Sequence, residues 1–248
     1  LKDHQGAIDD YSKAIELKPE EDHYYSTRGY SKYKLKDHKG AIDDYSKAIA
    51  LEPSKDFYYS SRGGNKSSLG DHQGAIDDYS KAIELEPNKA YYYSSRGYIQ
   101  AELKEYQEAI DDFSKAIELE PEEAYYYQIR GYCKGRLKDH QGAIDDYSKA
   151  IELEPNKDYY YSSRGSDKSS LGDNKGAIND YSKAIELNPD ENEYYIFRGN
   201  QRRISGDYQG AIDDYSKAIE LNPKNDLAYN NRGYTKTLLE DFDGAIKD

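Results

Sequence analysis

Apolar residues recur along the chain in one pattern that predicts a helix. In the stretch Gly74–Pro87, GAIDDYSKAIELEP, the apolar residues Ala, Ile, Tyr, Ala, Ile and Leu are separated by steps of one, three, three, one and two. These steps place them on one broad stripe of a helix, with most charged residues outside it. We expect Asp71, just upstream, to cap this helix, and Pro87 to end it because proline cannot continue a helix.

This pattern returns every 34 residues. The seven prolines of the chain all have this spacing: Pro19, Pro53, Pro87, Pro121, Pro155, Pro189 and Pro223. Seven glycines from Gly29 to Gly233 and seven arginines from Arg28 to Arg232 keep the same spacing. A fixed period of this length is typical of repeat proteins, in which each repeat is one supersecondary motif. We number the positions of each repeat from 1 to 34, with the proline at position 32.

The period accounts for the whole chain. Full repeats are expected at residues 22–55, 56–89, 90–123, 124–157, 158–191 and 192–225. Residues 1–21 form the back part of an earlier repeat, and residues 226–248 form the front part of a later one. No residues remain for a linker or a second domain, so we expect residues 1–248 to form a single solenoid.

The front half of each repeat predicts another helix. It starts after the proline, where Asn88 or Asp56 is expected to cap it, and runs through a tyrosine cluster to a step such as Leu69-Gly70. A glycine stands inside this helix at position 8, where it costs about 1 kcal/mol relative to alanine. Its recurrence predicts a helix–helix approach that a side chain would block. Each repeat is therefore predicted to form two helices.

Composition favours helices and limits the partners. Valine, methionine and tryptophan are absent and threonine is scarce, so β-sheets are poorly supplied. The net charge of −13 argues against nucleic acid or an anionic membrane as partner, and no apolar run is long enough to span a membrane. The single cysteine, Cys133, excludes an intrachain disulfide. The compartment stays open, because the chain begins at Leu1 and an upstream targeting segment would not be visible.

These features together resemble the tetratricopeptide repeat (TPR) family. The family pattern has an aromatic residue at position 4, Gly at 8, Ala at 20, an aromatic residue at 24, Ala at 27 and Pro at 32. One repeat supplies these residues as Tyr93, Gly97, Ala109, Phe113, Ala116 and Pro121. The resemblance covers the whole chain and implies an all-α fold, a right-handed α-solenoid of helix-turn-helix repeats.

Position 11 departs from the family pattern. The family usually has a large aromatic residue there, whereas this chain has Lys or Arg in six repeats and Gln100 in another. We expect either looser packing at the end of the first helix, or long stems that lie along the core and extend their charges to water.

The resemblance also implies roles for the tyrosine cluster. Position 4 is expected to face the core, position 3 to pack between repeats, and positions 2, 5, 9, 12 and 13 to line a concave groove. Tyrosine with Ser and Asn is typical of adaptable binding surfaces. The predicted partner-binding residues are Tyr91, Ser94, Tyr98, Tyr125, Gln128, Tyr132, Tyr159, Ser162, Asn200, Arg203, Asn230 and Tyr234.

Other candidate residues have structural interpretations. The histidines at position 17, such as His38 and His140, are expected to be half-buried fillers, because equivalent residues of neighbouring repeats lie too far apart for one metal ion. Paired aspartates such as Asp43-Asp44 are expected on a solvated outer face. The arginine at position 7 is expected to form an ion pair with an aspartate of the second helix. We predict no catalytic residue, cofactor or metal, since no nucleophile has a positioned base.

Two functions follow from this sequence. The first is a non-catalytic scaffold that binds a peptide or a helix of a partner protein in the groove. The alternative is a structural protein that stacks end to end with itself, because neither end shows a divergent capping repeat, although a truncated sequence explains the ends equally well. Residues 28–78 also match residues 130–180 at 39 of 51 positions. This offset of three repeats predicts either a recent duplication or a partner contact at every third repeat.

Overall fold

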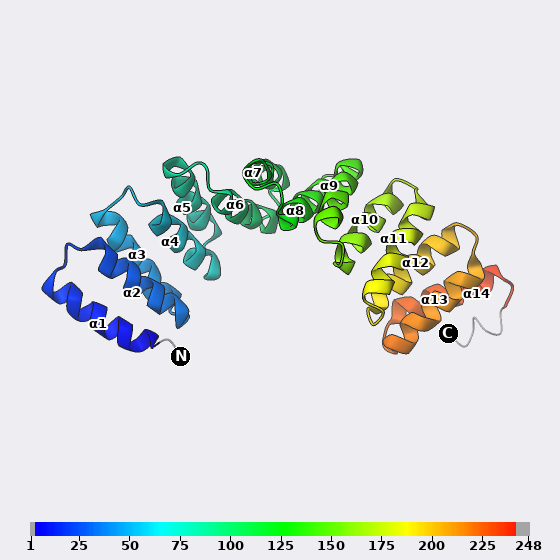
Figure 1. The fold of residues 1–248 in the computed structure, drawn as a ribbon. Helices are drawn as coiled ribbons and strands as arrows, with labels where there is room; N and C mark the ends of the chain where they lie inside the picture. The colour runs from blue at the N-terminus through cyan, green and yellow to red at the C-terminus, as the bar shows by residue number, and fades with distance from the viewer. Residues whose placement is uncertain (1–2, 242–248) are drawn as a thin grey trace. The chain divides into compact units, whose positions relative to one another are not determined.

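The computed structural model of the chain describes residues 3–241, which contain 14 α-helices and no strand. The predicted all-α fold is therefore confirmed for this part of the chain (Figure 1). The chain divides into two compact units, Leu1–Pro121 and Glu122–Asp248, which we describe separately.

Each unit contains seven helices in the described residues. The first unit holds α1 (His4–Leu17), α2 (Asp22–Lys34), α3 (His38–Leu51), α4 (Asp56–Ser68), α5 (His72–Leu85), α6 (Ala90–Glu102) and α7 (Tyr106–Leu119). The second unit holds α8 (Ala124–Arg136), α9 (His140–Leu153), α10 (Asp158–Ser170), α11 (Asn174–Leu187), α12 (Asn192–Ile204), α13 (Tyr208–Leu221) and α14 (Asp226–Leu238). The even-numbered helices open the repeats, and we call them first helices; the odd-numbered ones are second helices.

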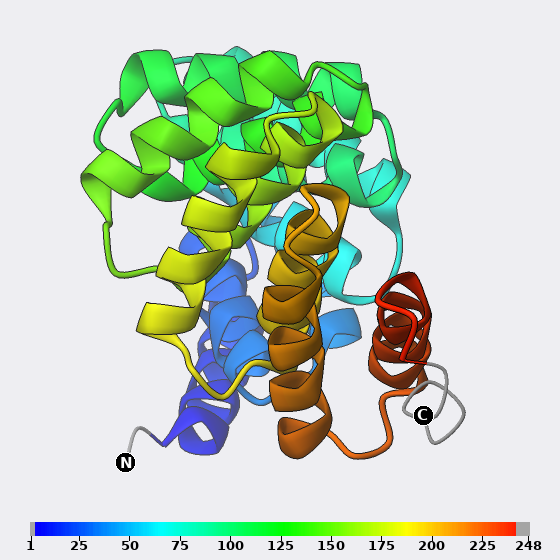
Figure 2. The same ribbon diagram turned by 90° about the vertical axis from the view of Figure 1, so that its right-hand side faces the viewer.

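Within each unit, every helix packs mainly on the helix before it and the helix after it. Figure 1 shows the helices in chain order, and in Figure 2 the yellow-to-orange helices α11 to α13 again lie side by side. This is the packing of an α-solenoid, in which each helix pair buries its apolar stripes against its neighbours. The handedness and the single array over residues 1–248 stay predictions.

The ends of the two kinds of helix differ. Asp71 caps α5 as predicted, because its carboxylate accepts a hydrogen bond of 3.0 Å from the backbone N–H of Gly74. The predicted caps of the first helices are wrong. Helix α4 begins at Asp56 itself, and the residue before it makes no side-chain cap bond; before α6 the capping position is Lys89, not Asn88.

The carboxylate of Asp56 is instead used between repeats. It accepts hydrogen bonds from the hydroxyl of Tyr92 in the next repeat and from the amine of Lys89, the last residue of its own repeat. The Tyr58–Asp22 and Tyr194–Asp158 pairs repeat the tyrosine contact. The predicted role of position 3, packing between repeats, is confirmed, since these tyrosines are buried and bind the repeat before them.

Position 4 supplies the predicted core tyrosine. Tyr59 is buried in a cluster with Ala75, Tyr79 and Ala82 of the same repeat. Its hydroxyl donates at 3.2 Å to the carbonyl of Pro53, which ends the preceding second helix. The ring therefore fills the core, while its polar tip satisfies an otherwise unpaired carbonyl at a helix end.

The two helices of a repeat approach closely at position 8. A Cβ atom at Gly63 would stand 3.2 Å from the Cβ of Asp78 and 3.3 Å from the carbonyl oxygen of Ala75. Such contacts are tighter than ordinary van der Waals contacts, so a side chain would crowd α5, and the predicted close approach is confirmed. The glycine brings the backbone of α4 next to the acidic residue of α5 at position 23.

That acidic residue is buried and is held by the arginine of position 7. Asp78 accepts hydrogen bonds from both Nε and Nη2 of Arg62, at 2.9 and 2.6 Å. The Nη1 atom of Arg62 donates to the hydroxyl of Ser46 in the preceding repeat at 3.1 Å. The predicted arginine–aspartate pair is confirmed, and the same bidentate pair recurs as Arg28–Asp44, Arg96–Asp112, Arg130–Asp146, Arg164–Asp180 and Arg198–Asp214.

The lysine at position 11 binds the same carboxylate, which corrects two predictions. Lys66 donates to Asp78 at 2.9 Å and to the carbonyl of Gly74 at 3.3 Å, so its charge does not extend to water. The paired aspartates do not share a solvated face either. Asp77 is exposed, whereas Asp78 is buried because a helix turns by about 100° between adjacent residues. A buried carboxylate needs such partners to offset its loss of hydration.

We expect Asp78→Ala to lower the free energy of unfolding by about 3 kcal/mol, because two cations lose their partner in a partly buried site. The midpoint of urea unfolding, followed by circular dichroism, measures this loss. The matched control is Asp77→Ala, which removes the exposed neighbour and should change stability by no more than about 0.5 kcal/mol. Equal losses in both variants would contradict a special role for the buried carboxylate.

The repeat of Gln100 lacks the second cation and offers a stabilising change. Burial raises the pKa of Asp112 although Arg96 opposes it. With its amide nitrogen facing Asp112, Gln100 donates at 2.9 Å to this carboxylate and at 3.3 Å to the carbonyl of Glu108. We expect Gln100→Lys to add about 1 kcal/mol of stability at pH 7, because a charge-assisted bond replaces a neutral one.

The pH dependence of this gain checks its cause. A second cation favours the ionised carboxylate of Asp112 and lowers its pKa in the folded state. The gain is therefore present above the pKa of Asp112 and is lost as the pH falls through it. Urea unfolding of wild type and variant at pH 7 and at pH 4 measures the difference; a gain that is independent of pH would rule out the ion pair as its source.

Candidate functional site

The first helices carry the exposed aromatic side chains. Within residues 3–241, all large aromatic residues that are well exposed lie on first helices: Tyr30, Tyr33, Phe57, Tyr91 and Tyr98 in the first unit, and Tyr125, Tyr132, Tyr159, Phe197 and Tyr234 in the second. We call the face that they share in each unit the first-helix surface. Exposed aromatic residues that gather on one face are typical of an interaction site.

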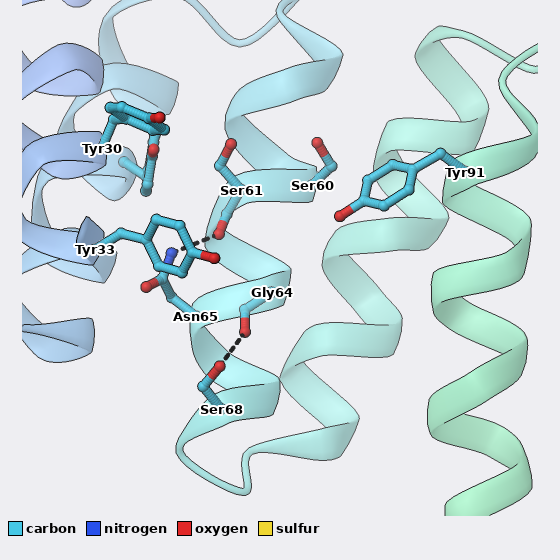
Figure 3. Close-up of a pocket in the computed structure, with 9 residues that line it drawn as sticks. Tyr30, Tyr33, Ser60, Ser61, Gly64, Asn65, Ser68 and Tyr91 are labelled. Carbon is cyan, nitrogen blue, oxygen red and sulfur yellow. Dashed lines mark hydrogen bonds between the residues drawn. The ribbon is translucent and has the colours of Figure 1, made fainter. Parts of the chain in front are cut away.

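A pocket of about 250 Å³ opens on the first-helix surface of the first unit. Figure 3 shows Tyr30 and Tyr33 of α2 on one side of it and Tyr91 of α6 on the other, with small polar residues of α4 between them. The residues that line this pocket are Tyr30, Tyr33, Tyr45, Ser60, Ser61, Gly64, Asn65, Ser68 and Tyr91. Its side walls are therefore aromatic, and its floor carries hydroxyl and amide groups.

The floor of this pocket is held by local hydrogen bonds. Asn65 is buried, and its amide nitrogen donates to the carbonyl of Ser61 at 2.8 Å. The amide oxygen of Asn65 lies 3.0 Å from Nδ1 of His38. Burial raises the pKa of Tyr45, so its hydroxyl is neutral and remains a hydrogen-bond donor. The pocket can therefore hold an uncharged group by aromatic contact and hydrogen bonds.

A second pocket, of about 280 Å³, lies on the first-helix surface of the second unit. Its lining comes from α8, α9 and α10 and includes charged residues: Tyr132, Gly135, Arg136, His140, Tyr147, Ser163, Ser166, Asp167 and Ser170. The carboxylate of Asp167 accepts a hydrogen bond of 2.7 Å from Nδ1 of His140. Burial raises the pKa of Asp167, while the contact with His140 opposes this shift.

Comparison with protein-family models identifies the repeat. Models described as tetratricopeptide repeat match residues 22–55, 90–123, 124–157 and 160–191, and a model described as TPR repeat matches residues 67–104 and 199–237. The chain belongs to the tetratricopeptide repeat family. TPR proteins are generally non-catalytic, and the fold of this TPR chain is that of a protein-interaction scaffold.

Solved structures of other TPR proteins resemble this chain. The crystal structure of MamA is 28% identical, with a TM-score of 0.64 over 65% of this chain and 95% of MamA. The C-terminal part of a TPR protein from Cytophaga hutchinsonii is 20% identical, with a TM-score of 0.80 over 92% of this chain and 94% of that one. YrrB, described as a TPR protein with an unusual peptide-binding site, is 23% identical, with a TM-score of 0.67 over 74% and 95%. A search of curated protein sequences gives no match to this TPR chain.

The structure places the predicted partner-binding residues on the first helices of this TPR chain, with different exposures. The exposed ones are Tyr91, Tyr98, Tyr125, Tyr132, Tyr159, Asn230 and Tyr234. The half-buried ones are Gln128, Ser162, Asn200 and Arg203. Ser94 is buried, and its hydroxyl donates to the carbonyl of Tyr91 on its own helix at 3.1 Å. Their binding role stays a prediction.

Only some of these residues are brought together. Tyr91 lines the first pocket and Tyr132 the second, whereas Tyr98 lines neither. Near the end of the second unit, the guanidinium of Arg203 lies 5.3 Å from the ring centre of Tyr234, a cation–π distance. The predicted set is therefore spread along the TPR surface rather than gathered at one point.

Sequence reasoning missed the floors of both pockets. Asn65 and Asp167 stand at position 10 and Ser61 and Ser163 at position 6, which the groove assignment did not include. The available signal was the amide or carboxylate at position 10 of these two repeats, where other TPR repeats have Ile99 or Cys133, although Gln201 also carries an amide there. The offset of 102 residues also connects the two pockets in the sequence.

The remaining candidates have structural roles. His38 and His140 are half-buried, as predicted, and each contacts position 10 of the next repeat. Among residues 3–241, no group of three or more His, Cys, Asp or Glu side chains is arranged to hold a metal ion. No described helix of this TPR chain is long and apolar enough to cross a membrane.

The thiol of Cys133 is expected to be unreactive in the folded TPR chain. The residue is fully buried, and burial raises its pKa to about 11, so the reactive thiolate is scarce at neutral pH. At pH 8, a disulfide reagent such as DTNB should label Cys133 much more slowly than it labels a small free thiol. In about 8 M urea, which unfolds the chain, Cys133 should be labelled as fast as the small free thiol. Fast labelling without denaturant would contradict the buried, protonated thiol.

Proposed function

We propose that the chain is a non-catalytic scaffold that binds a segment of a partner protein, an extended peptide or a helix, along its first-helix surface. The observation that carries this proposal is the gathering of exposed aromatic residues on the first helices, with two polar pockets between them. Tyrosine provides a large and rigid contact area at low entropic cost, and Ser and Asn add adaptable hydrogen bonds. Tyrosines in such pockets are typical binding hot spots.

The comparisons support the same class of partner. YrrB, whose fold is similar, is described as having a peptide-binding site. The first pocket of this chain is open on one side and has room for one or two side chains, which suits a peptide better than a large cofactor. The net charge of −13 opposes nucleic acid as the partner.

End-to-end self-assembly stays the alternative prediction. Size-exclusion chromatography with light scattering, over a wide range of concentrations, separates it from the scaffold. A monomer at all concentrations that still binds a peptide supports the scaffold. Growth into long assemblies with rising concentration supports the alternative.

We expect the double variant Tyr30→Ala/Tyr91→Ala to weaken peptide binding by at least about 30-fold, because each removes an aromatic wall of the first pocket. The ligand is a peptide that is selected from a random display library for binding to the wild-type chain and that contacts the first-helix surface of the first unit. Isothermal titration calorimetry measures the dissociation constant.

The control is Leu69→Ala/Leu103→Ala, which removes two exposed apolar residues of the same unit that do not line the pocket. It should bind the peptide as the wild type does. Circular dichroism confirms that both double variants are folded. Equal binding by the tyrosine variant and the wild type would count against the first-helix surface as the binding site.

A further inference from the structure

The two pockets are built on the same framework. Adding 102 to the residue numbers of the first pocket gives most of the lining of the second. The shared lining pairs are Tyr30 with Tyr132, Tyr45 with Tyr147, Ser61 with Ser163, and Ser68 with Ser170. The contact of the position-17 histidine with position 10 is also repeated, as His38–Asn65 and His140–Asp167. The offset of three repeats therefore corresponds to a repeated binding pocket.

The pockets differ at three lining positions. Asn65 of the first pocket is replaced by Asp167 in the second, Tyr33 by Gly135, and Gly64 by Ser166. Residues 28–78 and 130–180 match at 39 of 51 positions, and these three lining positions are among the twelve that differ. The replacement of an amide by a carboxylate changes the charge of the floor.

The carboxylate of Asp167 is poorly compensated where it lies. Its side chain is 13% exposed, and among the described residues His140 is the group that donates a hydrogen bond to it. The burial that raises the pKa of Asp167 disfavours its charge, and His140 only opposes this effect. The buried aspartates of position 23, in contrast, are each bound by an arginine. Asp167 is therefore an acid with capacity for a further cation.

Gly135 opens access to this carboxylate. A Cβ atom at Gly135 would lie 3.0 Å from Oδ1 and 3.4 Å from Oδ2 of Asp167, so Gly135 stands directly beside the acid and has no side chain that would cover it. In the first pocket Tyr33 stands at this position, with its ring centre 6.1 Å from that of His38. The aromatic wall of Tyr91 is also replaced, since the equivalent residue on α12 is the exposed Glu193.

We propose that the second pocket binds the cationic side chain of a lysine or arginine of the partner, with Asp167 as its counter-ion, while the first pocket takes an uncharged side chain. This inference rests on the peptide-binding function proposed above. At about 30 Å³ for each water-sized group, the pocket of about 280 Å³ has room for a lysine side chain. An ammonium group there donates a charge-assisted hydrogen bond in a partly desolvated site, where such bonds are strong.

The most direct test uses a small probe rather than a partner. N-acetyl-lysine methylamide and its uncharged isostere N-acetyl-norleucine methylamide are titrated into the isotopically labelled chain and followed by NMR. We expect the lysine probe to shift the amide signals of Ser163, Ser166 and Asp167, and to bind at least about tenfold more tightly than the norleucine probe. Equal binding of the two probes, or no binding of the lysine probe, would overturn the proposal.

Three variants show which residues act. Asp167→Asn copies the floor of the first pocket, so it should fold normally and lose the preference for lysine. Gly135→Tyr copies the aromatic wall and should block the probe. Arg136→Gln removes the cation on the rim and should leave lysine binding equal or stronger, because like charges repel. Loss of lysine binding in the Arg136 variant but not in the Asp167 variant would reverse the assigned charge preference.

The reciprocal change tests the same inference in the first unit. The double variant Tyr33→Gly/Asn65→Asp copies the second pocket, and we expect it to acquire lysine binding around Ser61 and Gly64. A double variant that folds, as judged by circular dichroism, but shows no preference for lysine would contradict the assignment to these two positions.

Peptide selection tests this inference separately from the proposed scaffold function on which it rests. Random peptides selected on the wild type should contain a Lys or Arg whose replacement by Gln weakens binding about tenfold, and this loss should vanish in Asp167→Asn. Selected peptides that bind the first-helix surface without such a residue would overturn the inference and leave the scaffold function standing. If no peptide is selected and the lysine probe also fails, both proposals are wrong.

Discussion

The buried aspartate at position 23 is the constraint on which the stack of helices depends. Asp78 is charged and almost inaccessible, so it must be neutralised by groups that reach it inside the structure. Arg62 and Lys66, one turn apart on α4, both bind it and hold α4 against α5. The same arginine also binds Ser46 of the preceding repeat. One carboxylate therefore sets the pairing of helices within a repeat and the stacking of that repeat on its neighbour.

This arrangement leaves part of each first helix free to vary. Positions 7, 8 and 11 are committed to the ion pair and the close approach, and positions 3 and 4 to the tyrosines of the core. Other positions, such as 9 and 10, lie outside these contacts, and there the repeats differ from one another. Position 9 is Tyr30, Gly64 or Tyr98 in three consecutive repeats, although the helices around it are alike. Binding chemistry can therefore change from repeat to repeat without loss of the packed core.

Much of this architecture is predictable because it is periodic. The 34-residue spacing of Pro, Gly and Arg predicts both helices of each repeat, and Gly63 and Arg62 have the roles expected of them. The errors concern polar residues that act across helices. The pattern Asp77-Asp78 suggests a solvated face, because a carboxylate is usually exposed. The burial of Asp78 is favourable only because Arg62 and Lys66 of α4 bind it. The caps of the first helices fail for the same reason, since Asp56 is bound by Tyr92 of the next repeat.

The candidate site is predictable only in outline. The exposure of Tyr91 and Tyr132 follows from their places on the first helix, whereas the pocket floors depend on how two first helices and a second helix meet. Asn65 and Asp167 face that junction, and the sequence pattern of one helix does not predict which residues of other helices meet there. The binding role of the predicted residues stays a prediction.

The duplication of three repeats gives these pockets a physical interpretation. Nδ1 of His140 contacts Oδ1 of Asp167, just as Nδ1 of His38 contacts Oδ1 of Asn65. The exchange of amide and carboxylate therefore keeps the geometry of the floor. Neither residue belongs to the arginine–aspartate pairs or to the tyrosine core, so the exchange leaves the stacking interactions intact. A charge can therefore be introduced into one pocket without loss of the contacts that stack the repeats. A scaffold with two copies of one pocket can in this way come to recognise two different side chains of one partner, or one side chain in each of two partners.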